Sequence, residues 1–409
     1  MKNCIKWLFS GLAIISLSSC VNQNTTASLE ETEIFSLEYG NFEDELNVYD
    51  YTRIGTINLD MAMYDGFFYI SNAESKKVME LNSYGDLLTL FYNEEVTPRP
   101  SFAIDDATVE NATRKAIEYP FNKLGKIAVD GRKYLYAVDS LPEERQELNE
   151  TETQVLSQIV LRFDGEGKFI DYLGQQGPGG TPFPYIRNIY VTRDNELVVV
   201  CNNGGGFIVY WFSMSGYLLF TVPIDKDLVP SPYTDDQASY IEIENVIPDS
   251  NSRVLYVNVN YYVERIDESS HMQSGIEYDS SQIQVLNVET GSYAKPLSIL
   301  PFEEENVSDF SSTTYKIPYD FLGVTESGWL FFILSTEKGF VIQMVQSNGQ
   351  KILTGQLDLD HSKMLYYTFA LDKTGILSII KVQPEKAVVS WWRTDDLLQS
   401  VVSNNNKKK

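Results

Sequence analysis

The 409-residue chain is acidic, with 57 Asp and Glu against 32 Lys and Arg and a formal net charge of −25. Nucleic acid is excluded as a partner of such a surface, because neutralising phosphates requires clustered Lys and Arg. With only two histidines, three cysteines and no HExxH or Cys-x-x-Cys motif, the chain also lacks the signatures of a zinc hydrolase.

Residues 1–19 have the composition of an export signal. Lys2 and Lys6 precede an apolar stretch, 7–17, that is shorter than the ~20 residues a transmembrane helix needs. Next come Leu17, Ser18, Ser19 and Cys20. This order resembles the lipobox of bacterial lipoproteins, which implies cleavage before Cys20 and lipidation of its thiol. The alternative is an ordinary signal peptide followed by a chance cysteine.

The segment after the lipobox, 20–33, is polar and predicts a flexible tether. Cleavage would remove Cys4 and acylation would occupy Cys20, which leaves only Cys201, so the fold cannot rely on an intramolecular disulfide. We expect an exported protein held to the periplasmic or surface side of a bacterial membrane by the lipid on Cys20.

Six copies of one unit follow the tether, and each copy alternates short apolar segments with polar turns. In the second copy, the expected strands are 126–130, 134–139, 158–164 and 168–173. The other copies occupy residues 59–90, 188–220, 245–291, 321–353 and 368–392. Short alternating segments separated by Gly, Asn and Asp are typical of an all-β protein.

A repeated four-stranded unit with two apolar faces predicts a six-bladed β-propeller of antiparallel blades, because only radial stacking buries both faces. The sixth unit lacks a fourth strand, and residues 34–37 form an isolated apolar strand. We therefore expect this N-terminal strand to complete the last blade, in a propeller domain of residues 34–400 followed by a disordered tail, 401–409. Seven blades are the alternative if 92–120 contains strands.

Five long insertions interrupt the repeats, and several are acidic. They comprise residues 92–120, 141–156, 223–240, 263–280 and 296–317. Loops on a rigid scaffold commonly carry binding, so these insertions are candidate docking elements. The alternative is that they are solvated decoration.

The second unit carries the most specific pattern. Ile127-Ala128-Val129-Asp130, Leu135-Tyr136-Ala137-Val138-Asp139 and Ile159-Val160-Leu161-Arg162-Phe163-Asp164 resemble an NHL-type repeat. The link 173–186 is similar to that of six-bladed propeller lipoproteins of Bacteroidetes and spirochaetes. The resemblance covers 124–222, is loose elsewhere, and implies a membrane-anchored propeller without implying a ligand.

Few residues suggest chemistry. Cys201 ends an apolar strand, which predicts a buried and inert thiol. The carboxylates Asp130, Asp139, Asp164 and Asp194 are expected mainly to cap turns. The segment 202–206 is Gly-rich and predicts a strand-joining turn. The segment 358–361, Asp-Leu-Asp-His, could ligate a metal, although a polar strand end is the simpler interpretation.

These observations favour a non-catalytic lipoprotein of the cell envelope whose propeller is a scaffold for a protein or a small ligand. No catalytic residue, cofactor or metal ligand is assigned. The alternative is a calcium-dependent hydrolase of lactones or esters, which would need inward Asp, Glu, Asn or His side chains from at least three blades. A third possibility is a role in outer-membrane protein assembly, as some propeller lipoproteins play.

Overall fold

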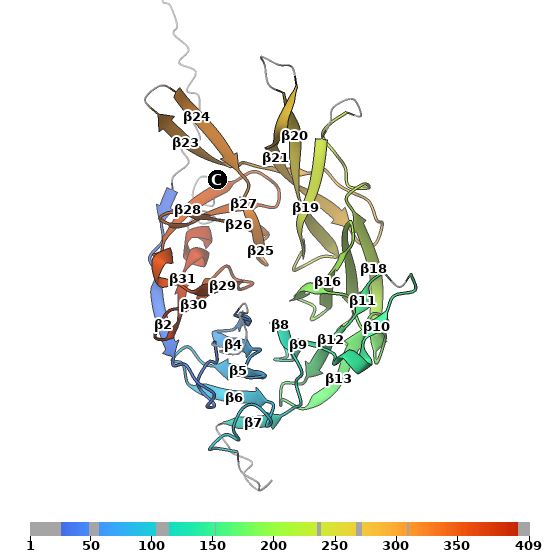
Figure 1. Cartoon of the computed structure of the whole chain (residues 1–409), viewed down its shortest axis with the longest axis vertical. Helices are drawn as coiled ribbons and strands as arrows, with labels where there is room; N and C mark the ends of the chain where they lie inside the picture. Colours follow the sequence, from blue (N-terminus) through green and yellow to red (C-terminus); the bar gives the residue numbers. More distant parts are fainter. Residues whose placement is uncertain are drawn as a thin grey trace, which may run out of the picture.

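Six small sheets are arranged in a ring in the computed structural model of the chain (Figure 1). The structure describes residues 26–48, 57–103, 114–151, 153–234, 239–266, 272–308 and 311–399. The predicted signal peptide, 1–19, and Cys20 lie outside these residues. Within them, no helix has the length and apolar character needed to span a membrane.

The first three blades are antiparallel and follow one another along the chain. Blade 1 consists of β3 (Leu59–Tyr64), β4 (Phe67–Asn72), β5 (Lys77–Leu81) and β6 (Leu87–Tyr92). Blade 2 consists of β8 (Leu124–Val129), β9 (Leu135–Ser140), β12 (Gln158–Phe163) and β13 (Phe169–Gly174). Blade 3 consists of β15 (Ile186–Val191), β16 (Leu197–Asn203), β17 (Gly206–Phe212) and β18 (Leu218–Asp225).

The last three blades repeat the arrangement. Blade 4 consists of β19 (Ser239–Pro248), β20 (Val254–Ile266), β21 (Gln273–Asn287) and β22 (Leu297–Ile299). Blade 5 consists of β25 (Asp320–Val324), β26 (Trp329–Thr336), β27 (Gly339–Gln346) and β28 (Ile352–Asp358). Blade 6 consists of β29 (Tyr366–Leu371), β30 (Leu377–Val382), β31 (Ala387–Trp392) and β2 (Thr32–Leu37). The predicted six-bladed propeller is confirmed.

The ring closes through the N-terminal strand, as predicted. β2 pairs antiparallel with β31, so that Phe35 lies opposite Val389. Phe35 also packs edge-on against Phe68 of blade 1, with 5.4 Å between ring centroids. The turn residue Gly85 lies against it at φ +82°, where a Cβ atom would come within 2.8 Å of the Phe35 Cβ atom. Blade 6 is therefore completed by the start of the chain and sealed against blade 1.

The apolar core lies between the blades. Six hydrophobic clusters are found among the described residues, and each joins two neighbouring blades. Leu255 and Val257 of blade 4, for example, share a cluster with Val209 and Trp211 of blade 3. Successive strand residues face opposite interfaces, so each blade contributes to both of its neighbours. This explains why both faces of the repeat are apolar in sequence.

Several predicted insertions contain strands. Residues 92–120 include β7 (Lys115–Glu118), which pairs parallel with β6 as a fifth strand of blade 1 and does not form a seventh blade. The other additions are β14 (Gly177–Pro178), η1 (Glu143–Arg145), β10 (Glu147–Leu148), β11 (Val155–Leu156), β23 (Phe302–Ser308), β24 (Ser311–Ile317) and η2 (His361–Lys363).

The predicted tether, 20–33, is in part ordered. Its residues 20–25 lie outside the described part of the chain, whereas β1 (Thr26–Ser28) pairs parallel with β28 and β2 begins at Thr32. The unpaired edge of β28 supplies backbone groups for β1, a partner that composition alone cannot reveal.

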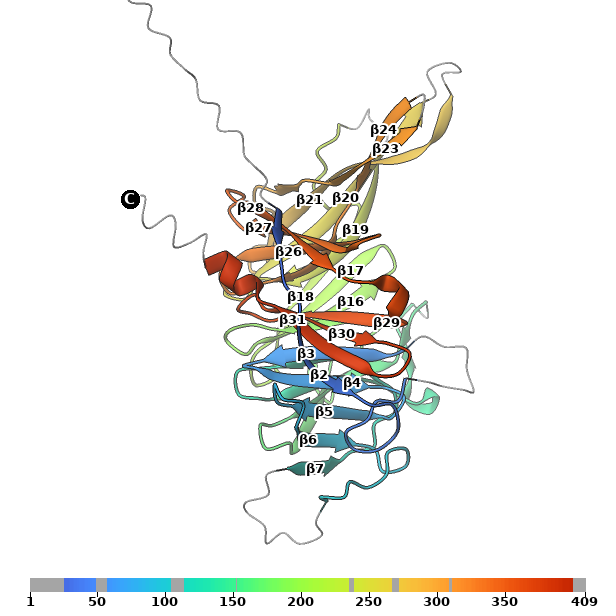
Figure 2. The same ribbon diagram turned by 90° about the vertical axis from the view of Figure 1, so that its left-hand side faces the viewer.

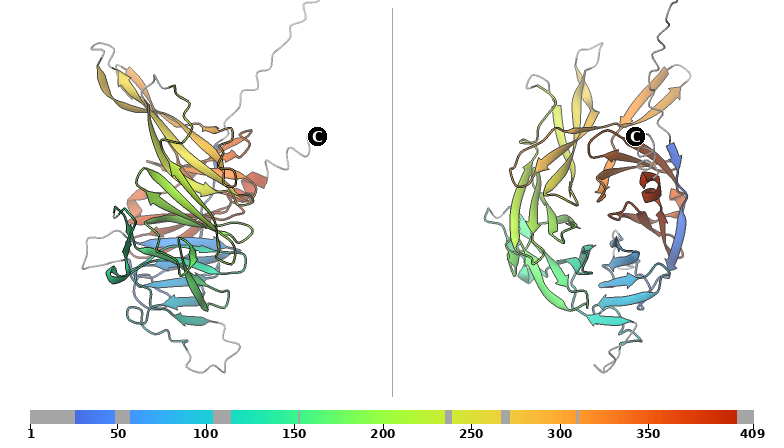
Figure 3. Two further views of the ribbon diagram at one scale, coloured as in Figure 1. Left: turned by 90° about the vertical axis from the view of Figure 1, so that its right-hand side faces the viewer. Right: turned by 180° about the vertical axis from the view of Figure 1, so that it is seen from behind.

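The ring has two different faces. The innermost strands β3, β8, β15, β19, β25 and β29 all run in the same sense across it. The face where they end, here called the turn face, carries short turns such as 65–66 and 131–133. The opposite face, here called the insertion face, carries 141–157, 226–238 and 300–319. Figures 2 and 3 show the long strands β20 and β21 and the hairpin β23–β24 projecting beyond the ring.

Candidate functional site

The carboxylates singled out in the sequence serve mainly as turn caps. Asp130 Oδ1 accepts hydrogen bonds from the backbone N–H groups of Arg132 (2.8 Å) and Tyr134 (3.0 Å). Asp164 Oδ1 similarly accepts from the N–H group of Lys168 at 2.8 Å. Asp139 accepts from the backbone of 122–123 at the start of blade 2, and Asp194 lies in the turn between β15 and β16. The expected capping role is confirmed for Asp130 and Asp164.

Cys201 is fully buried between blades 2 and 3, and burial raises the pKa of its thiol. The Gly-rich segment forms the β16–β17 turn, as predicted. His361 lies in η2, where its Nε2 atom is 3.0 Å from the carbonyl oxygen of Gly339. Among the described residues, no group of three His, Cys, Asp or Glu side chains is arranged to hold a metal ion. His271 lies outside those residues.

Four consecutive innermost strands carry a β-bulge. The pairing register shifts around 125–126 in β8, at Arg187 in β15, at Glu244 in β19 and at Leu322 in β25. A bulge leaves a residue out of the ladder and redirects its side chain. Lys126, Arg187 and Leu322 accordingly line a cavity at the centre of the ring.

Asp60 and Lys126 form an ion pair between blades 1 and 2. The Lys126 Nζ atom lies 2.7 Å from Asp60 Oδ1, and the Asp60 charge raises the pKa of the lysine. Asp60 Oδ2 also accepts the backbone N–H of Ile127 at 2.9 Å. This carboxylate therefore satisfies the backbone at the bulge of the following blade.

Glu244 makes the same kind of contact between blades 4 and 5. Its Oε2 atom accepts from the Asn258 side-chain amide at 3.0 Å and from the Phe321 backbone N–H at 3.3 Å. Burial raises the pKa of Glu244 to about 7, against the smaller effect of these donors. Both carboxylates thus hold the backbone of a neighbouring blade, and Glu244 changes its charge near neutral pH.

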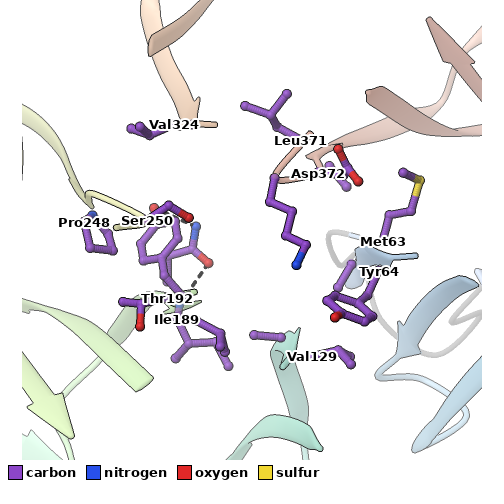
Figure 4. A pocket seen from close by; sticks show the side chains of 18 of the residues that line it. Met63, Tyr64, Val129, Ile189, Thr192, Pro248, Ser250, Val324, Leu371 and Asp372 are labelled. Carbon is purple, nitrogen blue, oxygen red and sulfur yellow. Dashed lines mark hydrogen bonds between the residues drawn. The ribbon is translucent and has the colours of Figure 1, made fainter. Parts of the chain in front are cut away.

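The turn-face mouth of the channel is a cavity of about 240 Å³ to which all six blades contribute. Figure 4 shows Met63 and Tyr64 of blade 1 across from Pro248 and Ser250 of blade 4. Polar groups here bond mostly to one another across blade boundaries. Such contacts join Gly131 N to Asn195 Oδ1 (2.8 Å), Arg193 N to Ser250 O (2.9 Å), Asn251 Nδ2 to Glu326 O (2.8 Å) and Glu326 N to Lys373 O (2.8 Å). These bonds tie neighbouring blades together around the mouth.

The insertion-face mouth is a cavity of about 420 Å³. Its wall includes Lys126, Arg187 and Asp320 and two tyrosines, Tyr185 and Tyr367, which are 58% and 36% exposed. The guanidinium of Arg187 has no hydrogen bond or ion pair within 4.0 Å among the described residues. Burial raises the pKa of the Asp320 carboxyl, and the charge of Arg187 opposes that change. This mouth therefore presents polar and aromatic groups that are open to a ligand.

A second candidate surface lies on the projection of blade 4, here called the wing: residues 239–243, 261–266 and 272–280 together with β23–β24. Its exposed apolar side chains are Tyr240, Ile266, Met272, Ile276 and Tyr315, each 44–68% exposed. Its charged side chains are mostly acidic: Glu242, Glu264, Glu277, Asp279, Glu303, Glu304 and Glu305, against Arg265 and Lys316. The wing thus combines exposed apolar groups with negative charge.

The sequence analysis did not identify Asp60, Arg187 or Glu244 as site residues. The expected innermost strands began at Asn188 and Asn245, one residue after each bulge, because the regular alternation starts there. The sequence does mark these positions, because a charged residue, Arg187 or Glu244, directly precedes each asparagine at the start of an apolar strand. Both asparagines also accept the following backbone N–H group at 2.9 Å.

Comparison with known proteins gives distant structural similarities and no match in sequence. No family model and no curated protein matches the chain in sequence. Among solved structures, it is similar to a streptogramin B lyase, with 12% identity, a TM-score of 0.36, and coverage of 89% of this chain and 97% of that one. It is also similar to an ulvan lyase, with 10% identity, a TM-score of 0.40, and coverage of 88% of this chain and 95% of that one. A calcium-binding regucalcin of Agrobacterium tumefaciens C58 is 10% identical, with a TM-score of 0.40 and coverage of 82% of this chain and 90% of that one. At these values, the similarity carries no information on activity.

Proposed function

We propose that the chain is a non-catalytic binding protein of a bacterial cell envelope, anchored through a lipid on Cys20 and docking a protein partner on its wing. The observation that carries this proposal is the wing itself. Strands β20 and β21 continue past the blade, where Ile266 and Ile276 are 59% and 53% exposed. Apolar side chains grouped on an extension of a rigid scaffold commonly mark a protein-binding surface.

The negative charge of the wing indicates the kind of partner surface that it would bind. The acidic wing disfavours anionic lipid headgroups and nucleic acid, and attracts a surface on which basic residues surround an apolar patch. Such a partner would bury Ile266 and Ile276 and place a basic group against Glu264, which lies directly opposite Ile276 in the β20–β21 ladder. Central apolar contacts set the affinity, whereas marginal charges set the rate of association and its dependence on salt.

The channel supports a binding role better than the calcium-dependent hydrolase alternative. Asp60 is paired with Lys126, and Glu244 is bonded to the neighbouring backbone. Side chains from three blades, Asn188, Asn245 and Asp320, do line the insertion-face mouth, but only Asp320 among them is a carboxylate. In the part of the chain that the structure describes, no group of three His, Cys, Asp or Glu side chains is arranged to hold a metal ion. Outer-membrane protein assembly remains one process in which a docked partner of the stated chemistry could take part.

Crosslinking in intact cells tests the docking proposal. Ile266→Asp and Ile276→Asp should each abolish a crosslinked complex that the unchanged protein forms. Ile170→Asp is the matched control, because Ile170 is 42% exposed on blade 2, away from the wing. Equal yields from all three variants, or a captured partner without basic residues at the contact, would contradict the proposal.

The anchor is tested separately. Cys20→Ala should remove incorporation of radioactive palmitate and release the protein from the membrane fraction, while Cys201→Ala should change neither. Retention of the label in Cys20→Ala would contradict lipidation at this position.

A further inference from the structure

The insertion-face mouth brings two cationic side chains, Lys126 and Arg187, into one cavity with exposed aromatic rings. At the turn-face mouth, Lys373 lies 3.3 Å from Glu326 and over the ring of Tyr64. By contrast, Arg187 is exposed and has no ion-pair partner among the described residues, although the protein as a whole carries a charge of −25. An unpaired arginine on a bulge in an acidic protein indicates a site for an anionic group.

The residues around Arg187 indicate which kind of anionic ligand the cavity would bind. Lys126 lines the same cavity, and with its side chain 39% exposed it retains ammonium hydrogens beyond the one bonded to Asp60. A guanidinium binds a carboxylate through two parallel hydrogen bonds. Asp320 is also on the wall and would repel a bare anion such as phosphate. It would instead accept hydrogen bonds from hydroxyl groups. The amide oxygens of Asn188 and Asn245 each accept one backbone N–H group and have a second lone pair for a hydroxyl.

Aromatic side chains complete the site. Tyr185 of blade 3 and Tyr367 of blade 6 both line the cavity, and Tyr367 is held in place edge-on against Phe340, with 5.1 Å between ring centroids. Exposed tyrosine rings offer flat apolar faces for the C–H face of a sugar ring. The volume of about 420 Å³ falls in the range of roughly 300–1,000 Å³ usual for small-ligand sites.

We infer that the insertion-face mouth binds an acidic saccharide: a sugar unit whose carboxylate is held by Arg187 and Lys126 and whose hydroxyls bond to Asp320 and the asparagines. The site is separate from the wing and does not depend on the proposed docking function. No chemical step is involved, because the ligand is bound and released unchanged.

Isothermal titration calorimetry on the full-length protein tests this inference. The probes are galacturonate and glucuronate with their disaccharides, neutral galactose and acetate. At least one uronate should bind, about tenfold or more tightly than galactose and acetate. Arg187→Met should weaken that binding by about tenfold or more, and Arg187→Lys should weaken it less, because one ammonium replaces a bidentate fork.

Arg193→Met is the matched control, because Arg193 is an exposed arginine at the opposite mouth. It should leave uronate binding unchanged, and thermal melting confirms that each variant is folded. Binding of no uronate, equal binding of galactose, or equal weakening by Arg187→Met and Arg193→Met would overturn the inference. Absence of any complex that depends on the wing, with uronate binding intact, would refute only the proposed docking function.

Discussion

Replacing Phe35 by alanine tests whether the N-terminal strand seals the ring. The side chain is 8% exposed and lies between blade 6 and blade 1, in edge-on contact with Phe68. Truncating a buried phenylalanine removes apolar contact and leaves a cavity, which costs about 3–5 kcal/mol. Gly85 cannot move in to fill that space without distorting its own turn. We therefore expect Phe35→Ala to fall in the upper part of this range.

Differential scanning calorimetry measures this loss of stability as a fall in the Tm. At about 2.1 cal/mol/K of unfolding entropy per residue, a propeller of about 370 residues loses about 1.3 °C of Tm for each kcal/mol, so Phe35→Ala should lower the Tm by roughly 5–6 °C. Phe42→Ala is the matched control, because Phe42 precedes blade 1 on the same segment but is 61% exposed. Its change should stay within about 0.5 kcal/mol. If both variants melted within about 2 °C of each other, the packing of β2 against blade 1 would not be a principal element of closure.

Three further outcomes are expected. The folded pKa of Glu244, about 7, exceeds its ordinary value of 4.5, so the unchanged protein loses stability as pH rises between these values. The Glu244→Gln variant should therefore have a higher Tm than the unchanged protein at pH 8 and the same Tm at pH 4.5. A difference in Tm that stays constant across pH would contradict this. Asp171→Ala leaves the buried guanidinium of Arg162 without its two 2.7 Å hydrogen bonds and should cost about 3–5 kcal/mol in urea unfolding, whereas Glu166→Ala at an exposed pair should cost under about 1 kcal/mol. Cys201 should react with a thiol reagent only after denaturation, and rapid labelling of the native protein would show that it is accessible.

The blades could be predicted from the sequence because apolar alternation of period two is a direct consequence of inter-blade packing. The closing strand was predictable for the same reason: residues 34–37 have an apolar pattern, and the last repeat lacks a strand. Local pattern was enough wherever a strand pairs with its neighbour in the chain.

Additional strands and the channel site were not predictable in this way. β7 runs parallel to β6 and is partly exposed, so its partner is set by the return path of the chain and not by alternation. The bulges at Arg187 and Glu244 interrupt the very periodicity that locates strands. Their proximity depends on the closure of the ring, which a single repeat does not contain.

Ring closure by β2 also governs the time course of folding. Glu31, just before this strand, pairs with Lys381, which lies 350 residues further along the chain. At the usual rate of about 5–20 residues per second, roughly 20–70 s of synthesis separate the two. Throughout that interval, β2 has no partner, and the face of blade 1 that packs against blade 6 has no cover. An unpaired apolar segment of this kind is prone to associate with other chains until β31 is complete, so pairing of β2 with β31 is the step that ends this exposure.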